Sequence, residues 1–209
     1  MGTLSYTGFL WKSSNLHGLH SPFIYAFASK GIYAKHAPRP QKNIALPIGM
    51  TREGAALLYR IIASFKISKM FVLGKDATAV TELLRAAGDA ANTKPWFFSP
   101  LAPIPGGFDL AYLNADTTED LLNLYRQASP NVNENSVIIV PAIHSNQEAE
   151  AAWEAIKKEP GVTVSADTYH LGFLFVKSGR PKQHFYIRQN DGALLNAVLG
   201  IRNLWGLLG

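Results

Sequence analysis

The sequence contains no cysteine, which excludes a disulfide scaffold, thiolate metal sites and a cysteine nucleophile. It also has no apolar run near the roughly 18 residues that a membrane span needs, and its first residues lack the pattern of a secretory signal peptide. We therefore expect a cytoplasmic protein. Charged residues are scarce at 17%, whereas hydrophobic residues reach 47%, so the 209-residue chain can form a core and is not intrinsically disordered.

Acidic residues are absent from the first quarter of the chain. The first of them is Glu53, and six bases precede it: Lys12, Lys30, Lys35, Arg39, Lys42 and Arg52. The net charge of +5 therefore belongs to the N-terminal segment. A basic arm can contact RNA, lipid headgroups or an acidic protein. Because the bases are spread out and form no block, we expect a solvated arm without specific nucleic-acid binding.

The distribution of proline, glycine and apolar residues divides the chain into three parts. Residues 1–49 are predicted to be a basic helical arm, with a helix over 22–34 that begins at Ser21-Pro22, and a proline-containing linker. Residues 50–188 are predicted to form one α/β domain. Residues 189–209 are an apolar tail, predicted to be helical, whose glycines require a partner surface to order it.

We expect this tail to bind protein, either a partner or a second copy of the chain in a homodimer. A membrane surface is a less favoured alternative. Membrane-surface helices usually carry a lysine-rich polar face, whereas the tail has a single base, Arg202.

Strand and helix patterns alternate between residues 50 and 160. The unbroken Val-Ile-Ile-Val of 137–140 suits a strand buried on both faces of a parallel sheet. Predicted strands cover 70–74, 95–100, 108–116 and 136–144, predicted helices cover 51–65, 117–128 and 147–158, with another helix after residue 77, and three closely spaced strands follow within 162–188. The sequence therefore predicts an α/β fold with a mostly parallel sheet and antiparallel C-terminal strands.

Two stretches resemble a known family: HGLHSPF at 17–23 and the long segment 133–188, from NENSVIIVP to HFYIR. Together with the helix and strand of 51–74 they cover about two thirds of the chain. The sequence is similar to a bacterial, O-methyltransferase-like subgroup of class I S-adenosylmethionine-dependent methyltransferases. This resemblance implies a Rossmann-like methyltransferase sheet, whereas activity depends on the residues of the site.

The positions at which the family binds its cofactor differ in this sequence. The family has a glycine-rich turn after the first strand, where only Gly74 is kept. An acid that binds the ribose hydroxyls follows the family's second strand, and residues 96–100 contain none. Asn114-Ala115 stands where the subgroup has aspartate and glycine. The resemblance implies that Gly74, Asn114 and Asp116 are vestigial cofactor-binding positions.

The chain is also shorter than the family's full-length members. Between the second and fourth strands the family has a helix, a strand and another helix, usually about forty residues, whereas residues 101–107 alone fill that interval here. The resemblance therefore implies a Rossmann-like sheet shortened by loss of a strand and its flanking helices. The lost segment would have formed the adenine side of the cofactor pocket.

His144 is the single candidate catalytic residue, as a general base, because it follows the carboxyl end of a strand, where α/β proteins bind ligands. Pro141-Ala142 precedes it where the subgroup has paired aspartates, so no carboxylate partner is visible in its motif. His17 and His20 lack a third ligand, and a Mg²⁺ or Ca²⁺ site needs several carboxylates. We therefore expect no metal site.

These observations favour a degenerate methyltransferase-like protein, a pseudoenzyme without a cofactor that works by protein binding or regulation. The alternative is an active class I methyltransferase that binds S-adenosylmethionine in an atypical site. The methyl acceptor, the partner and the oligomeric state are not specified by the residues.

Overall fold

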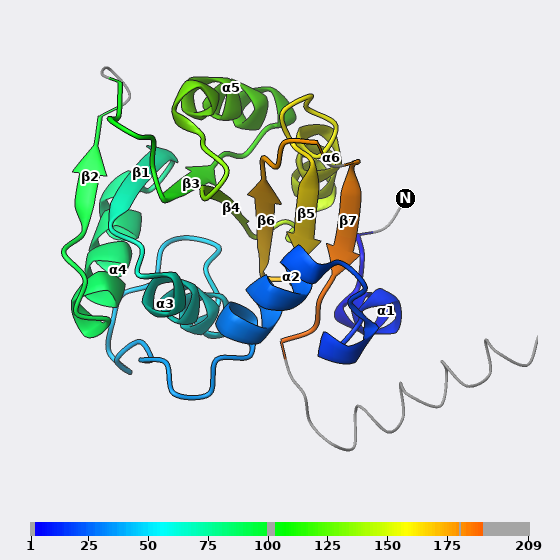
Figure 1. The fold of residues 1–209 in the computed structure, drawn as a ribbon, viewed down its shortest axis with the longest axis horizontal. Helices are drawn as coiled ribbons and strands as arrows, with labels where there is room; N and C mark the ends of the chain where they lie inside the picture. Colours follow the sequence, from blue (N-terminus) through cyan, green and yellow to red (C-terminus); the bar gives the residue numbers. More distant parts are fainter. Residues whose placement is uncertain (1–2, 100–102, 180, 190–209) are drawn as a thin grey trace, which may run out of the picture.

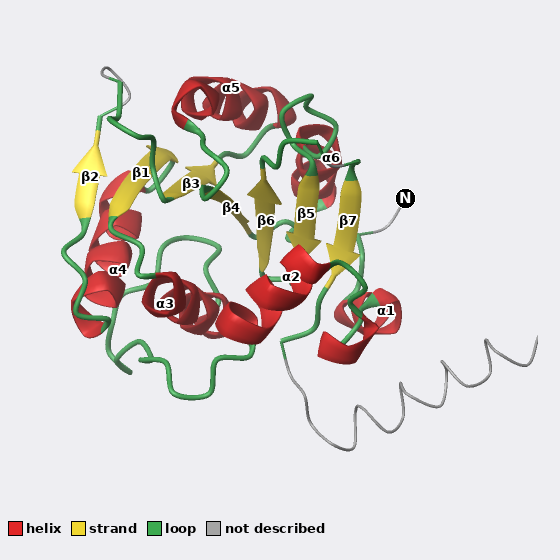
Figure 2. Cartoon of the chain, in the orientation of Figure 1, coloured by secondary structure: helices red, strands yellow, loops and turns green. Residues whose placement is uncertain are grey.

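A computed structural model describes residues 3–99, 103–179 and 181–189. One seven-stranded sheet forms its centre, with helices on both faces (Figures 1 and 2). The strands are β1 (Lys69–Gly74), β2 (Trp96–Phe98), β3 (Leu110–Asn114), β4 (Val137–Pro141), β5 (Val164–Asp167), β6 (Leu171–Phe175) and β7 (Gln183–Tyr186). The α-helices are α1 (Tyr6–Lys12), α2 (Pro22–Phe27), α3 (Arg52–Phe65), α4 (Ala77–Ala90), α5 (Thr118–Ala128) and α6 (Gln147–Ile156).

The strand order is β2-β1-β3-β4-β6-β5-β7. Strands β2, β1, β3 and β4 are parallel, and β6 runs antiparallel between β4 and β5. This confirms a mostly parallel α/β sheet with antiparallel pairing near its C-terminal end. The final strand differs from the prediction, because β7 pairs in parallel with β5. After β6 the chain crosses β5 and adds β7 at the edge of the sheet. Strand β7 therefore runs opposite to β6 and parallel to its neighbour β5.

The interval between the second and third strands of the chain is short, as predicted, although the sheet has seven strands. Strand β2 pairs with one side of β1 and β3 with the other, and residues 99 and 103–109 between them contain no helix or strand. As a result β2 is an edge strand, and its Trp96 is 66% exposed. In the described residues, no helix or strand therefore lies between β2 and β3 in the chain.

The two faces of the sheet carry separate cores. Helices α3 and α4 pack together over one face with α2, and α5 and α6 pack together over the other (Figure 1). Trp153 in α6 is 1% exposed. A Cβ at Gly172 in β6 would lie 2.5 Å from the Trp153 ring, so glycine provides the space that the indole fills.

The N-terminal segment packs against the domain. The predicted helix over 22–34 consists of α2 and a π-helical turn, η2 (Ala28–Ile32), and Ile24 and Ile32 are fully buried in the same core as α3. In HGLHSPF, Pro22 begins α2 and the ring of Phe23 packs edge-on against Phe175, with 5.0 Å between centroids. The motif thus attaches the segment to the sheet, while all six bases of residues 1–52 remain exposed.

No helix in the described parts of the chain is both long enough and apolar enough to cross a bilayer. The predicted tail of residues 189–209 lies outside the described residues, except for Gln189. The short helices η1 (Leu16–Gly18) and η3 (Ser129–Asn131) complete the regular elements.

Candidate functional site

Ligands of open α/β sheets bind at the carboxyl ends of the strands, where the strand order reverses. In this sheet the reversal lies between β1 and β3, because β2 occupies the outer side of β1 and the chain then crosses to the inner side (Figure 1). Helices α4 and α5 leave these two strands on opposite faces. Gly74 ends β1 and Asn114 ends β3, so two of the predicted cofactor positions lie directly at the reversal.

Contacts within the chain hold these two strand ends together. Gly74 has a φ of +94°, and a Cβ there would lie 2.0 Å from the carbonyl oxygen of Asn114. The Lys75 backbone N–H donates to that oxygen at 2.9 Å, and the Asn114 side-chain amide donates to the Lys75 carbonyl at 3.2 Å. Glycine is therefore required here by the approach of β3 to β1, independently of any ligand.

Side chains close the same crevice. Lys75 forms an ion pair with Asp116, the third predicted cofactor position. Asp76, in the left-handed conformation at φ 56°, accepts a hydrogen bond from the backbone N–H of Ile48 in the linker, at 2.8 Å. The structure thus brings Gly74, Asn114 and Asp116 together but engages Asn114 and Asp116 in bonds with Lys75.

The polar groups at this crevice bond to one another. The Asn114 carbonyl accepts from the Lys75 backbone N–H, and the Asp116 carboxylate is paired with Lys75. The described end of β2, Phe98 and Ser99, supplies no carboxylate for ribose hydroxyls. We therefore derive no methyl-transfer step at this crevice.

His144 lies in the loop between α6 and β4, the strand next to β3, and is held between two carboxylates. Its Nδ1 is 2.8 Å from Oε1 of Glu150, and its Nε2 is 2.8 Å from Oδ2 of Asp167 at the end of β5. The histidine side chain is 6% exposed and that of Asp167 is 4% exposed. The motif 141–144 supplies no carboxylate to His144, and its two carboxylate partners come from other elements, α6 and β5.

This arrangement favours the protonated form of His144. Burial lowers the pKa of His144, but hydrogen bonds and charges from Asp167 and Glu150 outweigh burial, so its pKa is raised. Both carboxylates accept, so both ring nitrogens must carry protons. Glu150 also accepts from the backbone N–H of Leu4, which joins the N-terminal segment to the pair. With both nitrogens engaged, His144 cannot act as a general base in this conformation.

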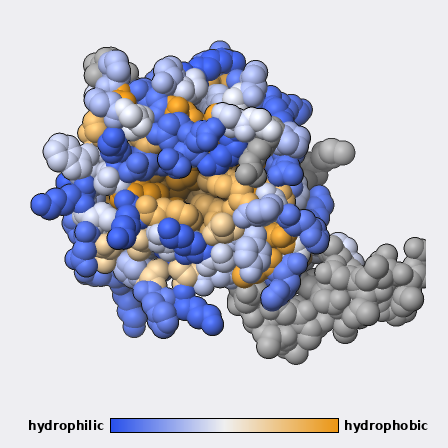
Figure 3. Space-filling model, viewed as in Figure 1, coloured by the Kyte–Doolittle hydropathy of each residue, from blue (hydrophilic) through white to orange (hydrophobic). Residues whose placement is uncertain are grey.

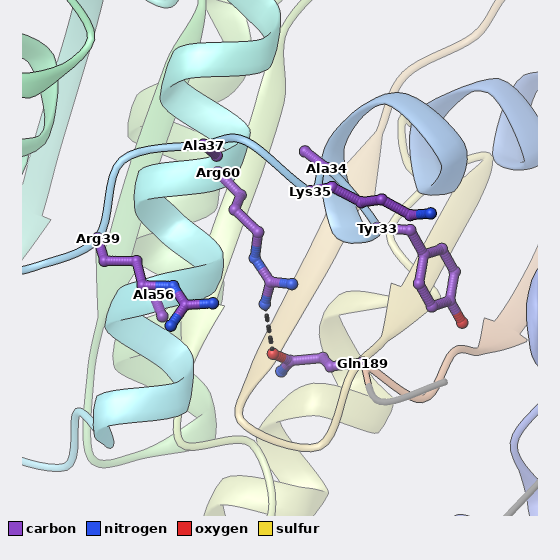
Figure 4. A pocket seen from close by; sticks show the side chains of 8 residues that line it. All are labelled: Tyr33, Ala34, Lys35, Ala37, Arg39, Ala56, Arg60 and Gln189. Atoms are coloured by element: carbon purple, nitrogen blue, oxygen red, sulfur yellow. Dashed lines mark hydrogen bonds between the residues drawn. The ribbon is translucent and has the colours of Figure 1, made fainter. Parts of the chain in front are cut away.

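Three neighbouring clefts lie along the carboxyl edge beside His144. The His144 cleft, of about 150 Å³, is lined by Gly49, Thr51, Ala142, His144, Ser145, Tyr169 and His170. The His170 cleft, of about 260 Å³, is lined by Tyr6, Phe9, Glu53, Ala56, Arg60, Thr168, His170 and Gln189. The Arg60 cleft, of about 450 Å³, is lined by Tyr33, Ala34, Lys35, Ala37, Arg39, Ala56, Arg60 and Gln189 (Figure 4).

Shared lining residues make the clefts neighbours, and none of the three is lined by Gly74, Asn114 or Asp116. Of these three clefts, the Arg60 cleft has a volume within the range of typical small-molecule sites, roughly 300–1,000 Å³. On another part of the surface, the hollow at the centre of Figure 3 is apolar. A cleft of about 370 Å³ is lined by Phe23 and Phe27 from α2.

His17 and His20 are exposed. Within the described ranges, no group of three or more histidine, aspartate or glutamate side chains is placed to hold a metal ion.

The sequence did not single out Arg60, Glu150, Asp167 or Gln189. The sequence contained one indication that Arg60 is unusual, because it is a base within the apolar run of the predicted helix 51–65. Glu150 and Asp167 lie 6 and 23 residues from His144, and neither spacing indicates contact without knowledge of the fold.

Comparisons with known proteins give structural likeness alone. No protein-family model matches the chain, and no curated protein matches it. One similar structure is a putative caffeoyl-CoA O-methyltransferase from Staphylococcus aureus, with 10% identity, a TM-score of 0.42, and coverage of 76% of this chain and 93% of that chain. Another is cofactor-bound Rv0187 from MTB, with 16% identity, a TM-score of 0.39 and coverage of 75% and 90%.

A third similar structure is the O-methyltransferase NcsB1 from neocarzinostatin biosynthesis in complex with S-adenosyl-L-homocysteine, with 14% identity, a TM-score of 0.36 and coverage of 59% and 46%. All three TM-scores lie below 0.5, so the strand order, and not these likenesses, defines the fold. The described chain has a Rossmann-like α/β fold, with a mostly parallel seven-stranded sheet, helices on both of its faces and one antiparallel strand, β6.

Proposed function

We propose that this chain is a methyltransferase-like protein that does not bind S-adenosylmethionine and acts instead by binding another molecule, in a regulatory role. The observation that carries the proposal is the closed crevice between β1 and β3. Its groups bond to one another: the Lys75 backbone N–H with the Asn114 carbonyl, the Lys75 side chain with Asp116, and Asp76 with the linker.

Opening this crevice for a cofactor would break more than an exposed ion pair. The Lys75–Asp116 pair is exposed on both sides and contributes little to stability. The backbone contact of Gly74 with Asn114 belongs to the parallel register of β1 and β3, so a ligand cannot displace it without separating the strands. No carboxylate on the described end of β2 would compensate by binding the ribose.

Thermal unfolding with S-adenosylmethionine or S-adenosylhomocysteine tests the proposal. A ligand at a hundredfold excess over its Kd adds about 2.7 kcal/mol to the folded state. For a chain of this size, each kcal/mol raises the Tm by about 2–4 °C. We expect no shift with either ligand at millimolar concentration. A saturable rise of several degrees would overturn the proposal.

The second candidate function is an active methyltransferase with an atypical cofactor site. One observation favours it: a glycine with positive φ is retained at the carboxyl end of β1, beside the strand reversal. If this function holds, Asp116→Asn should weaken binding of S-adenosylhomocysteine, whereas Asp120→Asn, at the start of α5, should leave it unchanged. If the proposed function holds, neither protein binds the ligand.

A further inference from the structure

The Arg60 cleft is a cavity that the proposed function does not use. It lies between the middle of α3, the segment 33–39 that follows η2, and Gln189 after β7. Three of its eight lining residues are cations, Lys35, Arg39 and Arg60, and none is an acid. In the described parts of the chain, no ion pair neutralises any of these three cations.

Arg60 is held in position for an external ligand. Its Nη1 donates to the carbonyl of Ile32 at 2.7 Å, and its Nη2 donates to Oε1 of Gln189 at 3.1 Å. The Gln189 amide in turn donates to the carbonyl of Thr168 at 3.3 Å. The buried Nε of Arg60 has no hydrogen-bond partner. A half-buried guanidinium is thus fixed by neutral acceptors and left without a counter-charge.

The cations are arranged around the same space. In Figure 4, Arg39 and Arg60 extend toward a common region beside Ala56, and Gln189 faces Arg60. Burial lowers the pKa of Arg60, and the positive charge of Arg39 lowers it further. Two guanidinium groups that repel each other in this way are stabilised when an anion binds between them.

The adjoining His170 cleft adds an aromatic wall. It shares Ala56, Arg60 and Gln189 with the Arg60 cleft. The rings of Tyr6 and His170 lie 6.4 Å apart and are tilted by 31°. Burial lowers the pKa of His170, although the charge of Glu53 raises it, so the imidazole is neutral at pH 7. Glu53, which lines the His170 cleft with Arg60, precedes it by seven residues on α3, about 10 Å along the helix axis.

We propose that the Arg60 cleft binds a small organic oxyanion, a carboxylate or a phosphate monoester, with the oxyanion between Arg39 and Arg60 and a flat apolar body toward Tyr6 and His170. Guanidinium groups match both oxyanions by paired hydrogen bonds. The proposal does not depend on whether the crevice between β1 and β3 takes S-adenosylmethionine, because the cleft and the crevice share no residue.

Calorimetric titration of the full chain at low ionic strength tests the proposal. The probes are benzoate and phenyl phosphate, which separate the two oxyanions, inorganic phosphate, which lacks the apolar body, and neutral benzyl alcohol. We expect saturable binding of benzoate or phenyl phosphate, weaker binding of inorganic phosphate and none of benzyl alcohol. Arg60→Gln should weaken the organic anion at least about tenfold, equivalent to 1.4 kcal/mol.

Two further variants complete the test. Arg39→Gln should also weaken binding several-fold, and because Arg39 is exposed, this variant keeps the test valid if Arg60→Gln does not fold. Arg126→Gln removes the same charge from α5, on the other face of the sheet, and should leave binding unchanged. The proposal is overturned if no probe binds saturably, if benzyl alcohol binds as well as benzoate, or if all three variants weaken binding equally.

Discussion

Replacing His144 with glutamine removes the cation between Glu150 and Asp167. Both partners lie 2.8 Å from the ring, and the Asp167 side chain is 4% exposed. Breaking a buried pair by removing one partner costs about 3–5 kcal/mol, because the other charge stays buried. A folded domain is stable by about 5–15 kcal/mol. We therefore expect His144→Gln to lower the free energy of unfolding by about 3 kcal/mol or more.

The difference between wild type and variant should depend on pH. Because the pKa of His144 is raised in the folded protein, its protonation stabilises the folded state fully below the unfolded pKa of about 6.5. This stabilisation is lost as the pH rises through the folded pKa. The difference in unfolding free energy should therefore be largest near pH 6 and should narrow toward pH 9.

Urea unfolding followed by circular dichroism between pH 5.5 and 9 measures both effects. Burial lowers the pKa of His170 and of His184, which gives the opposite pH dependence, but these residues contribute equally to both proteins and cancel in the difference. His17→Gln, at an exposed position, is the matched control. The double variant with Asp167→Asn should recover part of the loss, because it removes the buried charge. A loss below about 1 kcal/mol in His144→Gln, or a difference independent of pH, would refute the reasoning.

Three further predictions concern packing, the tail and the basic segment. Gly172→Ala places a Cβ 2.5 Å from the Trp153 ring and should lower the free energy of unfolding by about 1–3 kcal/mol in the same urea assay, whereas unchanged stability would contradict the packing. Removing residues 190–209 should lower the Tm or convert a dimer to a monomer in light scattering; vesicle binding by the full chain alone, with unchanged stability and mass, would indicate a membrane role. The chain should not bind RNA or acidic vesicles at physiological salt, and binding that is lost on deletion of residues 1–45 would contradict this expectation.

Most of the α/β framework follows from local patterns. The apolar spacing of 51–65 predicts α3 to within one residue, because Thr51 caps the helix by accepting from the Gly54 N–H at 3.0 Å. The strand predicted over 136–144 ends earlier, at Pro141, because Ala142 adopts a positive φ of 52° that turns the chain out of the sheet. The direction of β7 could not be predicted, since strand order depends on pairing between distant residues.

The candidate site could be predicted from the sequence less completely than the α/β framework. The loss of cofactor positions could be seen at Gly74 and Asn114 because a family pattern specified what should stand there. The carboxylates of His144 and the Arg60 cleft had no such pattern. Arg60 reaches Ile32 and Gln189 across 28 and 129 residues of sequence, and such contacts arise only when α3, η2 and the end of β7 have packed.

Calorimetric titration of the full chain with S-adenosylhomocysteine tests the central claim most directly, because it measures binding at equilibrium without a methyl acceptor. The closed crevice between β1 and β3 predicts no saturable heat up to millimolar ligand. Saturable binding of one molecule per chain, weakened by Asp116→Asn and unaffected by Asp120→Asn, would contradict it and establish the crevice as a cofactor site.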